Sequence, residues 1–219
     1  MTAETLISNS IIPLRTSDTG QEALEMMNDF FIRHLPIVNN KQLLGLISED
    51  DILNYDINEP IGSYRLSLLR PYATGTDHIY EVMRLMAESQ LTVIPVVNEE
   101  GDYTGLITQE DLLTYFAKTG TFTEPGSILV LEMSRRDYSL AEIARIVESE
   151  SALILSSFIS SHGDSARIDV TLKVNRQNVQ SIIATLERFD YHVKATFNES
   201  EYVDSLKERF DALMSYLKV

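Results

Sequence analysis

The chain has 219 residues, a formal net charge of −15 at pH 7 and no cysteine. This acidic balance argues against nucleic acid and membrane surfaces as partners, because both are negatively charged. Without cysteine, disulfides, thiolate catalysis and thiolate metal sites are excluded. With no basic leader and no apolar run of about 20 residues, the sequence fits a cytoplasmic protein.

An internal repeat organises the first 120 residues. Residues 33–38, an apolar stretch with an internal proline, are echoed by residues 92–97. Residues 45–53, which begin with Gly-Leu-Ile, are echoed by residues 105–113. Both pairs lie roughly 60 positions apart, so this part of the chain is expected to fold as two similar units.

Both copies predict the same order of elements. A helix comes first, and in the first copy Ala23, Leu24, Met27 and Phe31 share its apolar face. Two short apolar strands joined by a turn follow, and then a short second helix. The predicted helices are residues 21–31, 49–55, 79–88 and 109–118, and the predicted strands are residues 35–38, 43–47, 93–97 and 103–107.

Each second helix begins with a capping pattern. Ser48 or Thr108 stands at the N-cap position. Asp51 or Asp111 follows three residues later, where a capping box usually has Glu or Gln. The two short helices are therefore predicted to start at equivalent points of the two copies.

One copy alone leaves a sheet face and two helices half covered, so the copies at residues 1–60 and 61–120 are expected to cover each other. Such β-α-β-β-α repeats, packed as a pseudo-twofold pair, would form two equivalent clefts between their sheets. Residues 121–127 contain a Pro-Gly pair and predict a linker to a different domain. The predicted fold class of the chain is α+β.

The second half of the chain predicts the element order β-α-β-β-α-β, which is the ferredoxin-like arrangement. It covers residues 128–198 and includes a turn at residues 162–165. Residues 199–219 predict a C-terminal helix that either packs on its own domain or forms a dimer contact. Edge strands and this apolar helix favour a homodimer. The predicted strands are residues 128–133, 152–160, 166–174 and 191–197, and the predicted helices are residues 140–148 and 179–189.

The repeated pattern closely resembles a CBS-domain pair. An apolar strand with an internal proline is followed by Gly-Leu-Ile-Ser/Thr-x-x-Asp, twice in register over residues 5–118. The second half resembles an ACT domain, and the whole chain resembles the CBS–ACT proteins associated with acetoin utilisation in bacteria. Tyr138 stands where amino-acid-binding ACT domains usually have glycine. We therefore expect this domain to pair with another copy rather than bind an amino acid.

The resemblance implies that an adenosyl ligand, such as AMP, ADP, ATP or S-adenosylmethionine, binds in the clefts. It implies that the Ser or Thr and the Asp at each helix start contact phosphate and ribose. Residues just before the strand proline would line the base pocket. The implied ligand-binding residues are His34, Leu35, Ser48, Asp51, Val93, Ile94, Thr108 and Asp111. The alternative is that these hydroxyls and carboxylates only cap helices.

Acidic residues next to these positions restrict the ligand. Asp50 and Glu110 stand where many ligand-binding relatives have a basic residue. Because like charges repel, a polyphosphate is disfavoured there. We expect AMP-like or S-adenosyl compounds rather than ATP, with the second cleft, at residues 108–111, as the better candidate.

The sequence contains no catalytic motif and no cluster with metal-ligand spacing, so no catalytic residue and no metal site is expected. The chain is interpreted as a regulatory protein, not an enzyme. It would bind an adenosyl ligand and transmit binding to the ACT-like domain and to an unknown regulated protein. The alternative is a structural or adaptor protein that binds no ligand and dimerises through both halves.

Overall fold

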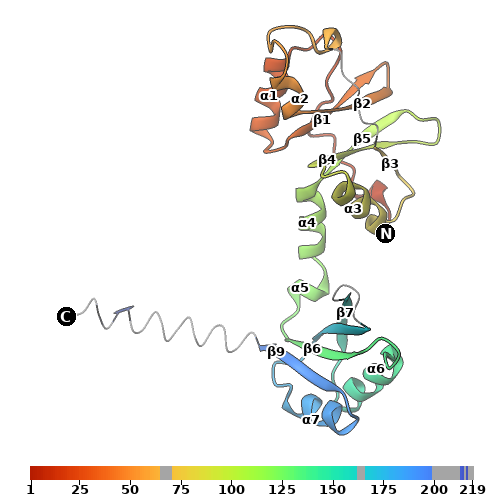
Figure 1. Ribbon diagram of the computed structural model, residues 1–219, viewed down its shortest axis with the longest axis vertical. Helices are drawn as coiled ribbons and strands as arrows, with labels where there is room; N and C mark the ends of the chain where they lie inside the picture. The colour runs from red at the N-terminus through yellow and green to blue at the C-terminus, as the bar shows by residue number, and fades with distance from the viewer. Residues whose placement is uncertain (65–70, 162–165, 199–212, 215, 217–219) are drawn as a thin grey trace. The chain divides into compact units, whose positions relative to one another are not determined.

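The chain divides into two compact units, Met1–Phe116 and Ala117–Val219 (Figure 1). The predicted turn at residues 162–165 lies outside the described residues, as does most of the predicted helix at residues 199–219. Within that helix, the described Leu213, Met214 and Tyr216 are helical and exposed. The computed structural model describes residues 1–64, 71–161, 166–198, 213–214 and 216.

The N-terminal unit contains the predicted tandem repeat, and the α+β fold class is confirmed. The first copy contains α1, β1, β2 and α2, and the second contains β3, α3, β4, β5 and α4. Two short 3₁₀ helices, η1 and η2, precede them. The elements are η1 (Ala3–Leu6), α1 (Gly20–Asp29), β1 (His34–Asn39), β2 (Gln42–Ser48), α2 (Glu49–Leu53), η2 (Ile61–Ser63), β3 (Ala73–Thr74), α3 (Ile79–Glu88), β4 (Val93–Val97), β5 (Tyr103–Thr108) and α4 (Gln109–Ala117).

The strands of the two copies pair in the same way. β1 runs antiparallel to β2, and β4 runs antiparallel to β5, with one register shift in each pair. A parallel partner lies on the other side: Ala73 of β3 pairs with Val96, and Leu14 pairs with Ile37. All five residues of β4 are buried, which explains why these strands read as continuous apolar runs rather than as an alternating pattern.

The two 3₁₀ helices are exchanged between the copies. The backbone N–H of Ala3 in η1 donates to Asp77 of the second copy at 2.8 Å, and Ala3 is fully buried in that copy's core. The N–H of Ile61 in η2 donates to Asp18 of the first copy at 2.8 Å, and Ile61 is buried there. The predicted boundary at residue 60 is therefore corrected, because each copy is completed by the segment that leads into the other.

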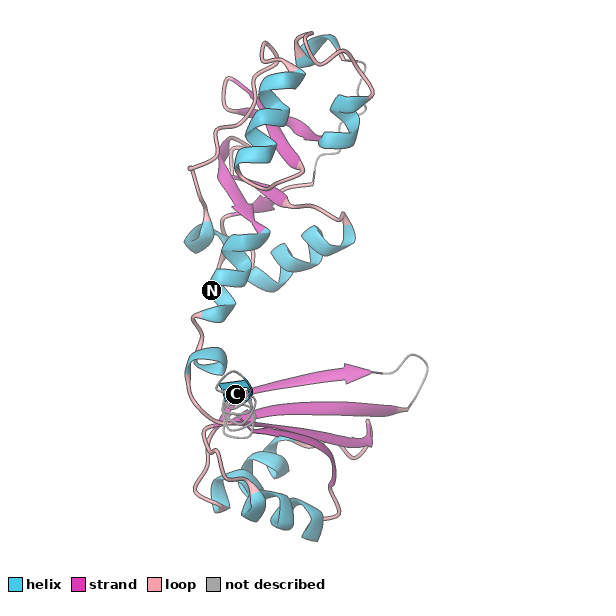
Figure 2. Cartoon of the chain, turned by 90° about the vertical axis from the view of Figure 1, so that its left-hand side faces the viewer, coloured by secondary structure: helices cyan, strands magenta, loops and turns pink. Residues whose placement is uncertain are grey.

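The C-terminal unit has the predicted β-α-β-β-α-β order after a short helix. Its sheet has the strand order β7-β8-β6-β9 with every pair antiparallel. Figure 2 shows α6 and α7 on the same face of this sheet. The elements are α5 (Gly120–Thr123), β6 (Ser127–Ser134), α6 (Leu140–Ser149), β7 (Ile154–Ser161), β8 (Arg167–Val174), α7 (Gln180–Arg188) and β9 (His192–Asn198).

The predicted linker at residues 121–127 is wrong at both ends. Most of its first half is helical in α5, and Ser127 is the first residue of β6. Ser127 is fully buried, and its hydroxyl donates to the carbonyl of Gln177 at 2.8 Å. Gly126 passes so close to the Val174 carbonyl that no side chain fits there, so its glycine serves close packing rather than flexibility.

Candidate ligand-binding cavity

A cavity of about 280 Å³ lies at the N-terminus of α4 in the N-terminal unit. Its volume is close to the lower end, about 300 Å³, of small-molecule pockets. Four parts of the chain line it: the segment after η1, the residues between α1 and β1, the residue before β4, and the turn into α4. Because both copies contribute, the cavity depends on their pairing. The lining residues are Ser8, Ser10, Ile11, Phe30, Phe31, Ile32, Thr92, Thr108, Gln109, Glu110 and Asp111.

Thr108 and Asp111 form a reciprocal cap at this helix start. Asp111 Oδ2 accepts from the Thr108 backbone N–H at 2.8 Å and from the Thr108 hydroxyl at 2.7 Å. The Thr108 hydroxyl oxygen in turn accepts from the Asp111 N–H at 2.9 Å. Both bonds to the carboxylate end on Oδ2. Oδ1 is therefore the acceptor that the cap leaves to a ligand hydroxyl.

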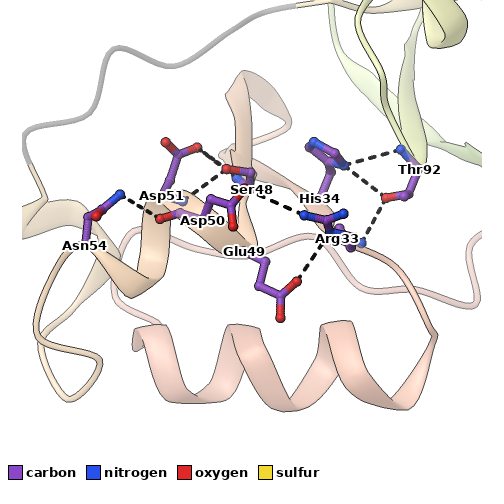
Figure 3. A network of polar contacts seen from close by, with 8 residues as sticks. All are labelled: Arg33, His34, Ser48, Glu49, Asp50, Asp51, Asn54 and Thr92. Atoms are coloured by element: carbon purple, nitrogen blue, oxygen red, sulfur yellow. Dashed lines mark hydrogen bonds and ion pairs between the residues drawn. The ribbon is translucent and has the colours of Figure 1, made fainter.

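The first copy has the same cap at the start of α2 (Figure 3). Asp51 Oδ2 accepts from the Ser48 N–H at 3.0 Å and from its hydroxyl at 2.6 Å. Arg33 lies 3.5 Å from Glu49 and 3.6 Å from Asp50, but these exposed ion pairs contribute little. α2 has five residues, against nine in α4. Ser48 and Asp51 do not line the described cavity.

A polar contact through Thr92, which lines the cavity, joins the two copies. The Arg33 backbone N–H donates to the Thr92 hydroxyl oxygen at 2.9 Å, and the Thr92 N–H donates to His34 Nδ1 at 3.3 Å (Figure 3). The Thr92 hydroxyl lies 3.1 Å from the same nitrogen. Burial lowers the pKa of His34, and the positive charge of Arg33 lowers it further, against the opposing carboxylates of α2. A neutral imidazole suits this contact between the copies, because its Nδ1 accepts the hydrogen bond from the Thr92 N–H.

The family match decides what this unit is. Residues 3–58 and 70–118 match the family model of the CBS domain. The N-terminal unit is a CBS domain pair. CBS domains typically bind adenosine-containing ligands and have a regulatory role.

Curated relatives match the CBS pair. An inosine-5'-monophosphate dehydrogenase of Korarchaeum cryptofilum is 26% identical over 111 residues, which cover 50% of this chain and 23% of that protein. The magnesium transporter MgtE of Thermus thermophilus is 35% identical over 114 residues, which cover 49% of this chain and 25% of the transporter. The chain thus spans about a quarter of the length of each of these relatives.

Solved structures include a CBS domain pair/ACT domain protein from Thermotoga maritima. It is 21% identical, has a TM-score of 0.48, and covers 54% of this chain and 98% of its own. A putative acetoin utilization protein from Vibrio cholerae is 24% identical with a TM-score of 0.45, covering 53% of this chain and 90% of its own. The assignment of the CBS pair therefore rests on the family model and on the geometry of the cavity.

The CBS pair brings part of the predicted site together. Of the predicted ligand-binding residues, Thr108 and Asp111 line the cavity. Leu35, Val93 and Ile94 do not, because each has no exposed surface and packs in a hydrophobic core. The expected base-pocket positions therefore lie in strands that are covered on both faces, and their side chains are not exposed to the cavity.

Two walls of the cavity were missed by the sequence analysis. Ser8 and Ser10 come from a segment without any repeat pattern, and their hydroxyls lie 2.7 Å apart. Phe31 was placed on the buried face of α1, which is wrong. α1 ends at Asp29, and Phe31 follows it with φ 53° and is 93% exposed. Paired aromatics at a helix end were the signal that could have pointed to this wall.

The charge of the cavity is negative. Glu110 and Asp111 line it, and the described lining residues include no Lys, Arg or His. Within the described part of the chain, no group of three or more His, Cys, Asp or Glu side chains could hold a metal ion. None of the described helices is long and apolar enough to cross a membrane. The negative charge of this lining would repel a polyphosphate more strongly than a singly charged anion.

Proposed function

We propose that the CBS pair is a sensor that binds an AMP-like or S-adenosyl compound in the cavity at the start of α4. One observation carries this proposal: both copies build a single cavity in which the Thr108 hydroxyl and the Asp111 carboxylate stand beside apolar side chains. This combination suits a ligand with a polar sugar and an apolar base. Its function is regulatory binding rather than catalysis.

The polar side of the cavity suits a ribose. Asp111 Oδ1 can accept a hydrogen bond from a ribose hydroxyl, as a charged acceptor binds such donors strongly. The Ser8 and Ser10 hydroxyls supply further donors and acceptors. Ile11 and Ile32 supply apolar surface for the base. A ligand that contacts all of these groups would bridge the two CBS copies.

The charge of the cavity selects among adenosyl ligands. Glu110 and Asp111 repel the several negative charges of ATP and attract the positive charges of an S-adenosyl compound. AMP has fewer negative charges to accommodate than ATP. The expected order of affinity is therefore S-adenosylmethionine and AMP ahead of ATP.

Transmission of binding would follow α4. The first residues of α4 line the cavity, and its last residue, Ala117, is the first of the C-terminal unit. A ligand that binds one arrangement of the two CBS copies better than another shifts their equilibrium. The ACT-like unit would then present that change to a regulated protein.

A second function is favoured by the exposed apolar surface of the C-terminal sheet. Phe158 on β7 is 69% exposed and Phe197 on β9 is 58% exposed. These two strands are the edges of the sheet, and exposed apolar side chains on a sheet can mark a protein interface. In this alternative the chain is an adaptor that forms homodimers and binds no ligand.

Matched variants test the sensor proposal. Wild type is titrated with AMP, S-adenosylmethionine and ATP by calorimetry, alongside Asp111→Asn and Asp51→Asn. Both substitutions change one capping carboxylate, but only Asp111 lines the described cavity. Asp111→Asn should weaken binding at least about tenfold, the loss expected for a charge-assisted hydrogen bond. Asp51→Asn should retain wild-type affinity.

The opposite results separate the two functions. Equal effects of Asp111→Asn and Asp51→Asn would mean that the carboxylates act only as helix caps. If none of the ligands binds wild type, the sensor proposal fails. A stable dimer by light scattering under the same conditions would then support the adaptor.

A further inference from the structure

We propose that Phe31 is the platform on which the planar base of the ligand stacks, and that it selects aromatic bases in the cavity beside α4. This inference rests on the proposed function and adds a residue that determines specificity. It follows from the exposure of Phe31, from its backbone conformation and from a comparison of the two CBS copies.

Phe31 lines the cavity, yet its side chain contributes nothing to the core. The residue is 93% exposed, and the neighbouring Phe30, also in the lining, is 41% exposed. Burial of an aromatic side chain in a core stabilises the folded state. At Phe31 that contribution is absent from the folded chain. It remains available for binding a flat apolar partner.

The backbone holds Phe31 in a fixed and uncommon conformation. Its φ is 53°, in the left-handed region where glycine or asparagine is usual and a bulky residue is an outlier. The Phe31 N–H donates to the Asn28 carbonyl at 3.3 Å, and the Ile32 N–H donates to the Met27 carbonyl at 2.9 Å. These two bonds close the end of α1, so the helix end sets the direction in which the Phe31 Cα–Cβ bond leaves the backbone.

The second CBS copy provides an internal comparison. Gln90 has the same φ of 53°, and its N–H donates to the Ala87 carbonyl at 3.3 Å. The Leu91 N–H donates to the Met86 carbonyl at 2.9 Å, as at the end of α1. The backbone is therefore equivalent, and it accepts a polar residue. An aromatic at position 31 is not required by the fold.

The other helix ends of this type lead to the same conclusion. Ser151 after α6 has φ 57°, and Asp190 after α7 has φ 63°. Both are polar, like Gln90. Phe31 is the large apolar residue among these four positions, and it is the one that lines the described cavity. The residue that departs from the polar pattern is therefore the residue that lines the cavity.

Stacking explains this coincidence chemically. Aromatic side chains bind nucleic acid bases through their faces, and each such contact is worth roughly 5- to 100-fold in affinity. The carboxylate of Asp111 and the hydroxyl of Thr108 lie in the same cavity. Phe31 would hold the base while these polar groups hold the sugar. A ligand that has the sugar and phosphate but no base would gain nothing from Phe31.

The test compares adenosine with ribose 5-phosphate by calorimetry on the full chain. Phe31→Ala should weaken adenosine binding about tenfold or more and leave ribose 5-phosphate binding unchanged. Phe31→Tyr should restore adenosine binding because it keeps the aromatic face. Gln90→Ala, which changes the equivalent position outside the cavity lining, should bind both ligands like wild type.

A second measurement reports the contact directly. The chain contains no tryptophan, so Phe31→Trp introduces a single indole at the cavity. Adenosine should quench or shift its fluorescence, whereas ribose 5-phosphate should not. Thermal unfolding of each variant should stay close to wild type, because Phe31 is exposed and packs in no core.

The failures of the two proposals are distinguishable. If wild type binds adenosine and Phe31→Ala binds it equally well, the stacking role is overturned and the sensor remains. If Phe31→Ala weakens adenosine and ribose 5-phosphate equally, Phe31 shapes the cavity instead of recognising the base. If wild type binds no adenosyl ligand at all, the sensor and the stacking role are overturned together.

Discussion

Asp51 and Asp111 occupy equivalent places in the two CBS copies, and each closes a helix cap with three bonds to its Ser or Thr partner. Loss of such a cap costs about 1 kcal/mol whichever copy it occurs in. The two carboxylates are thus matched in their structural role. They differ in surroundings, since Asp111 faces the described cavity. Stability and binding should respond differently to their substitution.

The contact between the two copies at His34 makes the stability of the fold depend on pH. Its pKa lies below its ordinary value of 6.5 in the folded chain, chiefly because of burial. Between the lowered and the ordinary pKa, the unfolded chain binds more protons, so stability rises with pH across that window and is lost as pH falls through it. His34→Val, which copies the residue at the equivalent Val93, should flatten this slope.

Thermal unfolding between about pH 5 and pH 8 measures this effect, since that range covers the titration of histidine. A His192→Gln variant, which changes an exposed histidine in the C-terminal unit, is the control and should keep the wild-type profile. If His34→Val and wild type show the same slope over this range, the contact between the copies does not depend on a neutral imidazole.

At the scale of elements, the segment after η1 is held by β5. Ser8 and Leu106 exchange two backbone hydrogen bonds, of 2.8 and 3.1 Å. Gly105 allows this approach: a side chain there would collide with Ile7 and lie 3.0 Å from the Ser8 carbonyl oxygen. One glycine therefore positions the segment that brings Ser8 and Ser10 to the cavity.

Gly105→Ala should consequently impair both folding and binding. We expect a loss of about 2 kcal/mol or more in the free energy of unfolding, from overpacking together with backbone strain. Adenosyl-ligand affinity should fall as well, because the cavity wall is displaced. Denaturant unfolding and calorimetry measure the two effects.

Gly101→Ala is the matched control. Gly101 also has a positive φ, of 83°, but a side chain there would meet nothing within 4 Å. It should lose about 1 kcal/mol from backbone strain alone and keep its ligand affinity. Equal binding by Gly105→Ala and wild type would show that the segment does not shape the site.

The sequence predicted most elements because their local signals are strong. The caps at Ser48 and Thr108 and the helical spacing of apolar residues located α2, α4 and the longer helices within a few residues. The packing of η1 in the second copy was not predictable, because residues 1–10 have neither periodicity nor a turn motif. The short helix α5 was missed since a Pro-Gly pair is a signal for linkers as well as for close packing.

The site was predicted where chemistry and local structure coincide. Thr108 and Asp111, which the CBS resemblance implied and whose capping pattern is visible in the sequence, line the cavity. Val93 and Ile94 lie one and two positions beyond the residue that lines the cavity. Because their strand is buried on both faces, neither its odd nor its even positions face a cavity. Thr92, just before that strand, lines it instead. Phe31 fits the helical spacing of the apolar residues in α1, but the helix ends before Phe31, so the spacing does not place its side chain on the buried face.

At the scale of the whole molecule, the open face of the C-terminal sheet is the clearest candidate for self-association. Ile128 pairs with Phe197 across β6 and β9, and Phe158 pairs with Thr171 across β7 and β8. These residues alternate with core residues such as Leu129, so they lie on the face that α6 and α7 leave uncovered. A second copy of the chain could cover this apolar surface.

Phe158→Glu should therefore convert a homodimer into a monomer, because it places a charge in the interface. Light scattering coupled to size-exclusion chromatography measures the mass. Leu153→Glu is the control: Leu153 is 58% exposed and precedes β7, outside the sheet. A dimer that survives Phe158→Glu would place the interface elsewhere on the chain.

The exchanged 3₁₀ helices make the CBS copies mutually dependent. A chain cut between residues 64 and 71 would leave η2 with the first copy, whose core it completes, but would separate η1 from the core of the second copy. Loss of the first nine residues would damage the distant α3 region through Ala3 and remove Ser8 from the ligand site at the same time. Removal of these residues should therefore abolish the proposed ligand binding, although it leaves both repeated sequence signatures whole.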